Sequence, residues 1–257
     1  MLSERQTLLL SAVMLLAALG GVLAYLLARQ RRQPLRFMQS FWYAVNYVVA
    51  RIVWRARVSG PLPIPSDKGA VIICNHRSSL DPSFIEVTTN RVVHWMVARE
   101  FFDRPVLSWF LRLAEAIPVG RGGIDNKATK MAIRYAQNGG LVGLFPEGRI
   151  NQTDQVLLPG RPGAVMIALR ARVPVIPCYI HGAPYDGTPL GCLLMSAKVR
   201  LVIGPPVDLS EFYGLEDDRE VLEELTRRFL RAIATLAGRP EFEPQVAGRF
   251  YKPVQGN

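Results

Sequence analysis

A histidine and an aspartate lie with four residues between them in residues 75–82, a pattern that could activate a hydroxyl group. A histidine can take a proton from a hydroxyl nucleophile, and an aspartate beside it can fix its tautomer and stabilise the imidazolium. On one continuous helix His76 and Asp81 would lie about 140° apart, at roughly 100° per residue, so the pair needs a loop to meet. Residues 70–74 are typical of a buried strand, and Asp81-Pro82 is typical of a helix start with the aspartate as N-cap. Alternatively, His76 only packs a turn and Asp81 only caps the helix.

Two further runs combine arginine with turn residues and could hold an anionic group. Residues 118–123 place Arg121 among glycines, which let a backbone approach an anion, while arginine can bind phosphate through two donors. A Gly-rich turn with a solvated arginine has the same pattern, and the GK[ST] ending of a Walker loop is absent. This run alone therefore leaves both interpretations open.

The second of these runs, residues 145–150, contains Glu147, Gly148 and Arg149. Here the arginine could bind a phosphate and the glutamate a hydroxyl, although a salt-bridged turn would use the same residues. Arg161 follows just before a predicted helix, and a helix N-terminus favours anions.

The segments between these runs predict an α/β fold with a mostly parallel sheet covered by helices. In such sheets ligands bind beyond the carboxyl ends of strands, which is where the three runs lie. The expected strands are residues 70–74, 92–97, 116–119, 141–145, 173–180 and 198–203. The expected helices are residues 82–89, 105–114, 125–138, 163–171 and 218–237.

The amino-terminal region predicts membrane attachment. Residues 7–28 carry no charge and are long enough to span about 30 Å of hydrocarbon, which favours a retained transmembrane anchor over a cleaved signal. Arginines follow at once, so the positive-inside rule places the main domain in the cytoplasm. Residues 35–54 form an amphipathic helix, expected in the membrane interface or else docked on the domain. The expected division is an anchor (1–33), an interfacial helix (34–59), an α/β domain (60–237) and a tail (238–257).

The net charge and the cysteine and histidine content limit which ligands the protein is expected to bind. The formal net charge of +10 suits nucleic acid, an anionic membrane or an anionic substrate. No nucleic-acid-binding module is recognisable, and the basic residues gather beside the apolar segment and in the candidate head-group loops. The three cysteines form no CxxC pair and the three histidines no Cys/His cluster, so we expect no metal site.

Together the runs resemble the glycerophospholipid acyltransferase family, best known from its 1-acylglycerol-3-phosphate acyltransferases. The family's histidine and aspartate separated by four residues match residues 75–81, and its Phe-Pro-Glu-Gly block matches residues 145–148. The threonine that follows in the family is missing, so Arg149 arrives one position early. Residues 117–121 resemble the block that ends in an arginine, and residues 173–177 resemble the block with a fixed proline.

The resemblance implies acyl transfer from acyl-CoA or acyl-carrier protein to the free hydroxyl of a lysophospholipid in the bilayer. His76 would be the general base and Asp81 its partner. The acceptor would be held by Arg121, Glu147, Gly148, Arg149 and Arg161. No cofactor, metal or nucleic acid is implied. A membrane-associated thioesterase or hydrolase, and a non-catalytic lipid-binding protein of the same fold, remain alternatives.

Overall fold

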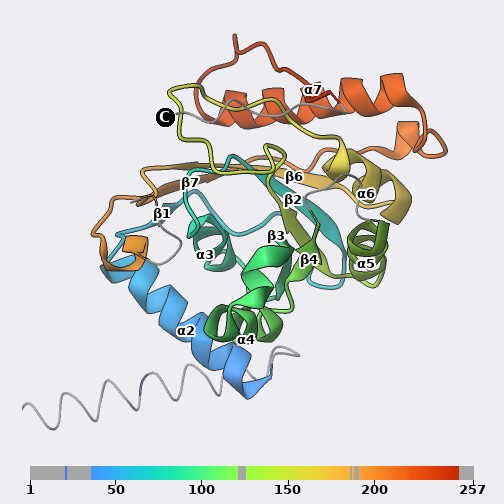
Figure 1. The fold of residues 1–257 in the computed structure, drawn as a ribbon. Coiled ribbons are helices and arrows are strands. Elements are labelled where there is room, and N and C mark those ends of the chain that lie inside the picture. The colour runs from blue at the N-terminus through green and yellow to red at the C-terminus, as the bar shows by residue number, and fades with distance from the viewer. Residues whose placement is uncertain (1–20, 22–35, 121–125, 186, 188–190, 249–257) are drawn as a thin grey trace, which may run out of the picture.

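The computed structural model describes residue 21 and residues 36–120, 126–185, 187 and 191–248. Within these residues seven strands form one sheet, in the order β1-β7-β6-β2-β5-β3-β4 (Figure 1). In chain order the strands are β1 (Arg57–Val58), β2 (Ala70–Cys74), β3 (Val93–Ala98), β4 (Ile117–Val119), β5 (Leu141–Leu144), β6 (Val175–His181) and β7 (Arg200–Ile203). All neighbouring pairs are parallel except β6 and β7, so the predicted mostly parallel sheet is confirmed.

Helices cover both faces of this sheet (Figure 1). They are α2 (Phe37–Ile52), α3 (Asp81–Glu86), α4 (Pro105–Leu113), α5 (Asn126–Gln137), α6 (Gly163–Ala171) and α7 (Arg219–Leu236). The described residues also contain the 3₁₀ turns η1 (Arg99–Asp103), η2 (Gly191–Leu194) and η3 (Ser210–Phe212).

The central strand β2 contributes to two hydrophobic cores, one on each face of the sheet. Its five residues are all buried, as expected of a strand packed on both faces, and successive side chains point to opposite sides. Val71 and Ile73 join the core that α5, α6 and α7 complete. Ala70, Ile72 and Cys74 join the second core, to which α2 and α3 contribute. The predicted covering role of residues 218–237 is thereby confirmed.

Helix α2 packs on the domain through a side that buries Ala44 and Ala50 and also makes three side-chain hydrogen bonds to backbone carbonyls. Gln39 Nε2 donates to the Leu113 carbonyl (2.9 Å), the Tyr43 hydroxyl donates to the Arg91 carbonyl (3.2 Å), and Asn46 Nδ2 donates to the Ser83 carbonyl (2.9 Å). The outward side of the helix is apolar. Its exposed large apolar residues are Phe37, Met38, Phe41, Tyr47, Val48 and Ile52. The amphipathic helix predicted at residues 35–54 is therefore present. On its polar half Gln39 and Ser40 are buried and Asn46 is half-buried, whereas Arg36 and Arg51 are exposed.

The two ends of the chain differ from the predictions or lie outside the described residues. The predicted transmembrane anchor in residues 1–33 lies outside the described residues, apart from Gly21. In the part of the chain that the structure describes, no helix combines the length and hydrophobicity needed to cross a bilayer. Strand β1 was not predicted. It pairs with β7, so the sheet includes residues from the segment 34–59, which was predicted to hold only the interfacial helix. The tail, predicted without structure, forms a bridge between Val246 and Gly160.

The missing side chain at Gly143 of β5 makes room for the Trp95 ring. A Cβ atom built at Gly143 would lie 2.6 Å from the Trp95 ring, well inside contact distance. We therefore expect Gly143→Ala to lower the free energy of unfolding by about 1–3 kcal/mol, the usual cost of overpacking a core. Chemical denaturation measures this change.

Gly163→Ala is the matched control, because nothing lies within 4 Å of a Cβ at Gly163. It should leave the free energy of unfolding unchanged or raise it slightly. Equal effects of the two substitutions would contradict the packing argument.

Candidate active site

The loop between β2 and α3 is fixed to the neighbouring strand by Asn75. This side chain is buried, and its amide makes two hydrogen bonds with Ile180 of β6: Nδ2 donates to the carbonyl (2.9 Å) and Oδ1 accepts from the N–H (2.7 Å). An asparagine amide can replace a peptide group in this way, so it continues the β2–β6 pairing by one residue. The loop therefore leaves the carboxyl end of the sheet at a defined point.

The loop brings the predicted pair together. His76 Nδ1 lies 2.9 Å from Asp81 Oδ2, and the Asp81 carboxylate is fully buried. The same carboxylate oxygen accepts from the backbone N–H groups of Arg77 (2.7 Å) and Ser78 (2.8 Å). A buried carboxylate needs such donors, and here they come from the loop that carries the histidine.

The predicted N-cap role of Asp81 is wrong. Helix α3 begins at Asp81 and its N-cap residue is Leu80, whose side chain makes no capping hydrogen bond. The Asp81 side chain turns back to the preceding loop because three N–H donors converge there. The carboxylate thus orients the histidine and does not cap the helix.

An aromatic stack fixes the plane of the histidine ring. The His76 ring lies against Phe145, with centroids 3.8 Å apart and planes 6° from parallel, and Phe145 lies against Trp95 at 5.0 Å. With Nδ1 directed at Asp81, Nε2 is the ring nitrogen that can take a proton from a bound hydroxyl. The His76 side chain is 16% exposed, so that edge can still be reached from outside. The sequence placed Phe145 in the Phe-Pro-Glu-Gly block without giving it a role, and it did not single out Trp95, which resembles an ordinary core residue of a strand.

Glu147 holds the backbone of the same histidine. Its carboxylate is buried; Oε1 accepts from the His76 N–H and Oε2 from the Leu158 N–H, each at 2.8 Å. Burial raises the pKa of Glu147 to about 7, against the opposing effects of these two N–H donors and of the Arg77 charge. The predicted contact of Glu147 with an acceptor hydroxyl stays a prediction, and the structure adds a positioning role.

Arg77 fastens the segment that follows Glu147 to the histidine loop. Its guanidinium donates to the carbonyls of Asn151, Thr153 and Gln155. The Asn151 N–H in turn donates to the His76 carbonyl at 2.7 Å. Glu147 and Asn151 therefore hold the two sides of the His76 main chain. Sequence reasoning missed Arg77 and Asn151 because their partners lie more than 70 residues away.

Three of the other predicted binding residues lie in or beside the Glu147 turn, and the fourth lies outside the described residues. Gly148 has the left-handed φ of 68°, and the Arg161 side chain lies 3.4 Å from the position a Cβ would take there. The Arg161 N–H also donates to the Pro146 carbonyl (2.9 Å), so the structure brings Arg161 to the Glu147 turn. Arg149 follows in the same turn and is half-buried. Arg121 lies outside the described residues.

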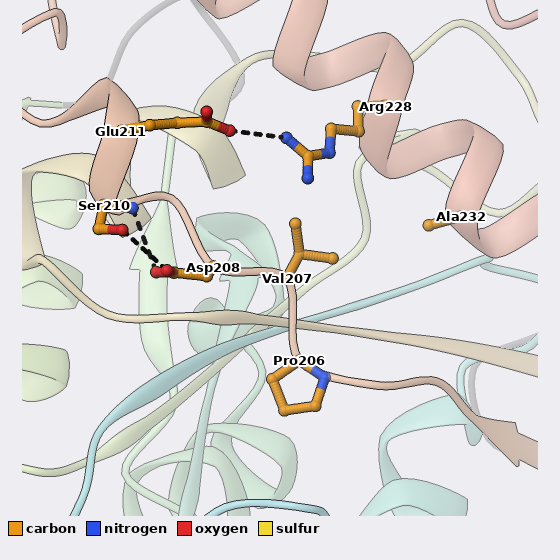
Figure 2. Close-up of a pocket in the computed structure, with 7 residues that line it drawn as sticks. All are labelled: Pro206, Val207, Asp208, Ser210, Glu211, Arg228 and Ala232. Atoms are coloured by element: carbon orange, nitrogen blue, oxygen red, sulfur yellow. Dashed lines mark hydrogen bonds and ion pairs between the residues drawn. The ribbon is translucent and has the colours of Figure 1, made fainter.

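A cleft of about 460 Å³ lies elsewhere, between the segment after β7 and helix α7 (Figure 2). Its charged lining residues are Asp208, Glu211 and Arg228, of which the last two form an ion pair at 3.5 Å. This lining is separate from the His76 corner. Among the residues that the structure describes, no group of three or more His, Cys, Asp or Glu side chains is placed to hold a metal ion.

Comparisons with known proteins identify the family. Residues 55–181 match the Acyltransferase family model. A 1-acyl-sn-glycerol-3-phosphate acyltransferase of Bacillus subtilis is 30% identical over 174 residues, which are 67% of this chain and 83% of the relative. The chain belongs to the glycerophospholipid acyltransferase family.

A second relative and a solved structure agree with the family and with the fold. The 1-acyl-sn-glycerol-3-phosphate acyltransferase of Streptococcus pneumoniae is 24% identical over 186 residues, 69% of this chain and 67% of the relative. The crystal structure of the 1-acyl-sn-glycerophosphate acyltransferase of Thermotoga maritima shares the fold, with a TM-score of 0.58 and 23% identity over 93% of this chain and 99% of that one. The protein is thus an acyltransferase, and the resemblance predicted from its sequence is confirmed.

The contacts of Arg77 predict a positioning role in this acyltransferase. Arg77→Met removes all the guanidinium hydrogen bonds to residues 151–155 and should free that segment. We expect faster hydrogen exchange of the Asn151 amide and a kcat lower by about tenfold or more, because small misplacements of catalytic groups are costly. Hydrogen exchange and steady-state kinetics measure both.

Arg219→Met is the control, since Arg219 is an exposed arginine paired with Glu223 on α7. It should alter neither quantity. Unchanged exchange at Asn151 in Arg77→Met would show that the guanidinium does not hold the segment.

The raised pKa of Glu147 predicts a pH-dependent stability. The folded protein holds this proton up to about pH 7, whereas the unfolded chain releases it near 4.5. Between these values the folded state binds more protons, so the contribution of Glu147 to stability falls as pH rises through this window, by about 3 kcal/mol in total. Glu147→Gln lacks the titration and should lose less stability than wild type between pH 5 and pH 8.

Denaturant unfolding of both proteins at the two pH values measures this difference, because all other titrating groups are shared. If wild type and Glu147→Gln lose stability in parallel, the pKa of Glu147 is not raised on folding.

Proposed function

We propose that this acyltransferase moves a fatty acyl group from acyl-CoA or acyl-carrier protein to the free hydroxyl of a lysophospholipid. The proposed acceptor is 1-acylglycerol-3-phosphate, which would give phosphatidic acid. The observation that carries the proposal is the 2.9 Å contact between His76 Nδ1 and Asp81, made on the face of Phe145. The names of the relatives from Bacillus subtilis and Streptococcus pneumoniae support the choice of acceptor.

In the proposed reaction His76 Nε2 takes the proton of the acceptor hydroxyl, and Asp81 stabilises the imidazolium. The hydroxyl oxygen attacks the thioester carbonyl carbon and forms the new C–O bond. The C–S bond then breaks, and the departing thiolate takes the proton from the imidazolium. No acyl-enzyme is needed. Of the two serines in the histidine loop, Ser78 is fully buried and its hydroxyl donates to the Pro184 carbonyl, and the Ser79 hydroxyl lies 3.2 Å from Cys192 Sγ.

The acceptor phosphate would be bound by Arg149 and Arg161, together with Arg121, and an acceptor hydroxyl by Glu147. Arginine suits this task because its planar guanidinium can make two parallel bonds to phosphate oxygens. Gly148 supports the proposal because its left-handed backbone lets the turn pass the Arg161 side chain. The donor is a substrate, and the proposed reaction uses neither a cofactor nor a metal ion.

We further propose that the protein is bound to the membrane, where lysophospholipid and product reside. Residues 7–28 would form a single span, with the catalytic domain on the cytoplasmic face. Helix α2 would lie in the interface, and its exposed apolar side supports this position.

The test is acyl transfer by membranes that contain wild type or His76→Ala. Labelled acyl-CoA and acyl-carrier protein are supplied with a panel of lysolipids, and the products are separated. Wild type should form a diacyl lipid, whereas His76→Ala should lose about 10²–10⁴-fold in rate, the usual contribution of a general base.

Membrane attachment and thermal unfolding of His76→Ala serve as the control and should match wild type. Free fatty acid as the only product would identify a thioesterase or hydrolase. Near-normal transfer by His76→Ala would exclude this histidine as the base, and no product from either protein would favour a non-catalytic role.

A further inference from the structure

Helix α4 exposes a compact apolar stripe. Val106, Trp109 and Phe110 are 81%, 50% and 40% exposed. These positions are spaced three and four residues apart, so they share one face of the helix. Contiguous exposed apolar groups of this size indicate an interaction site, because single exposed apolar residues are common but grouped ones are not.

This stripe is continuous with the exposed apolar side of α2. The Trp42 ring on α2 contacts Trp109 edge-on at 6.2 Å and Phe110 at 5.9 Å, and it also contacts Phe41 at 5.6 Å. Figure 1 shows α2 and α4 side by side, with α7 on the opposite side of the sheet. We define the α2–α4 face as the exposed apolar residues Phe37, Met38, Phe41, Val48, Ile52, Val106, Trp109 and Phe110.

The charges of these helices suit an anionic surface. Neither α2 nor α4 contains an aspartate or glutamate. Exposed arginines are found at the residue before each helix, Arg36 and Arg104, and in the last turn of each, Arg51 and Arg112. Apolar and aromatic side chains bordered by arginines are typical of surfaces that enter the headgroup layer of anionic membranes.

The α2–α4 face is joined to the catalytic corner from two sides. Parallel strands β2, β5 and β3 end at the same edge of the sheet, where His76 follows β2. Strand β3 continues from this edge through η1 directly into α4. On the other side, Asn46 of α2 donates to the Ser83 carbonyl in α3, the helix that begins with Asp81.

We propose that α4 is a second membrane-docking element, which places Val106, Trp109 and Phe110 in the interfacial layer of an anionic bilayer beside α2. This inference rests on the proposed membrane-bound function and extends it to residues outside the amino-terminal region. Docking through both helices holds the edge of the sheet that carries His76 against the bilayer. A lysophospholipid then reaches the histidine without leaving the membrane surface.

The first experiment measures lipid contact without turnover. The three native cysteines are buried, so Val106→Cys introduces an exposed thiol for an environment-sensitive fluorophore. The labelled full-length chain is placed in phosphatidylglycerol-containing vesicles, in a wild-type and in a His76→Ala background. We expect quenching by brominated lipid and protection from aqueous iodide in both backgrounds, so a failed catalytic proposal would leave this result unchanged.

Leu215→Cys is the matched control, because Leu215 is 43% exposed in the segment between η3 and α7. A probe there should be quenched by iodide and not by brominated lipid. Two results at position 106 would overturn the proposal. Quenching by iodide alone would mean that α4 faces water, and protection without brominated-lipid quenching would mean that protein covers it.

The second experiment measures the consequence for acyl transfer. Val106→Glu places a charge at the most exposed position of α4 and should lower transfer to a long-chain lysophospholipid in vesicles by about tenfold, as expected for losing a buried valine-sized group. Transfer to a short-chain acceptor dissolved as monomers should match wild type, as should both rates in Leu215→Glu. Equal losses with both acceptors would place the effect in the catalytic corner and contradict docking.

Discussion

The architecture of the catalytic corner depends on one requirement, that the buried carboxylate of Asp81 be given hydrogen-bond donors. An ionised group without contact to water is costly unless several donors surround it. Here Oδ2 accepts from the His76 ring and from the next two backbone N–H groups, so the loop closes on that oxygen, while the buried Oδ1 has no hydrogen-bond partner among the described residues. The histidine orientation follows from this arrangement. Asn75 and Glu147 then fix the loop to β6 and to the turn after β5.

The strand order explains why residues remote in sequence complete this corner. Because β5 lies beside β2 and β3 lies beside β5, the residues that follow each strand meet at one edge. Phe145 thereby reaches the His76 ring, and Gly143 leaves the space in which Trp95 supports Phe145 from behind. The same edge brings in Asn151, which holds the His76 carbonyl. The histidine is thus fixed in its plane, along its main chain and at one ring nitrogen.

Much of this could be predicted from the sequence, because apolar periodicity and turn residues act locally. Strand β2 and helix α6 have the predicted bounds, and the other predicted helices and strands in the described residues differ by a few residues at their ends. The His76–Asp81 pair followed from residue type and spacing. The short strand β1 and the long-range contacts of Arg77 have no local pattern. The capping role assigned to Asp81 was wrong because Asp-Pro at a helix start is locally typical, whereas the competing donors of the loop are known only from the folded backbone.

The orientation of α2 connects these local rules to the proposed membrane function. In water an amphipathic helix buries its apolar side, since burial is worth about 25 cal/mol per Å² of apolar surface. Helix α2 buries only the small apolar residues Ala44 and Ala50 on its inward side. On the same side Gln39, Tyr43 and Asn46 donate to three backbone carbonyls, at the end of α4, in the segment before β3 and inside α3. These bonds satisfy three carbonyls and fix the helix relative to α3. The large apolar residues of α2 remain exposed. The proposed bilayer would cover them and leave the inward hydrogen bonds intact. The hydrogen bond from Asn46 that fixes the orientation of α2 is also the one that ties it to the helix beginning with Asp81, so the proposed interfacial position of α2 would hold that helix near the bilayer.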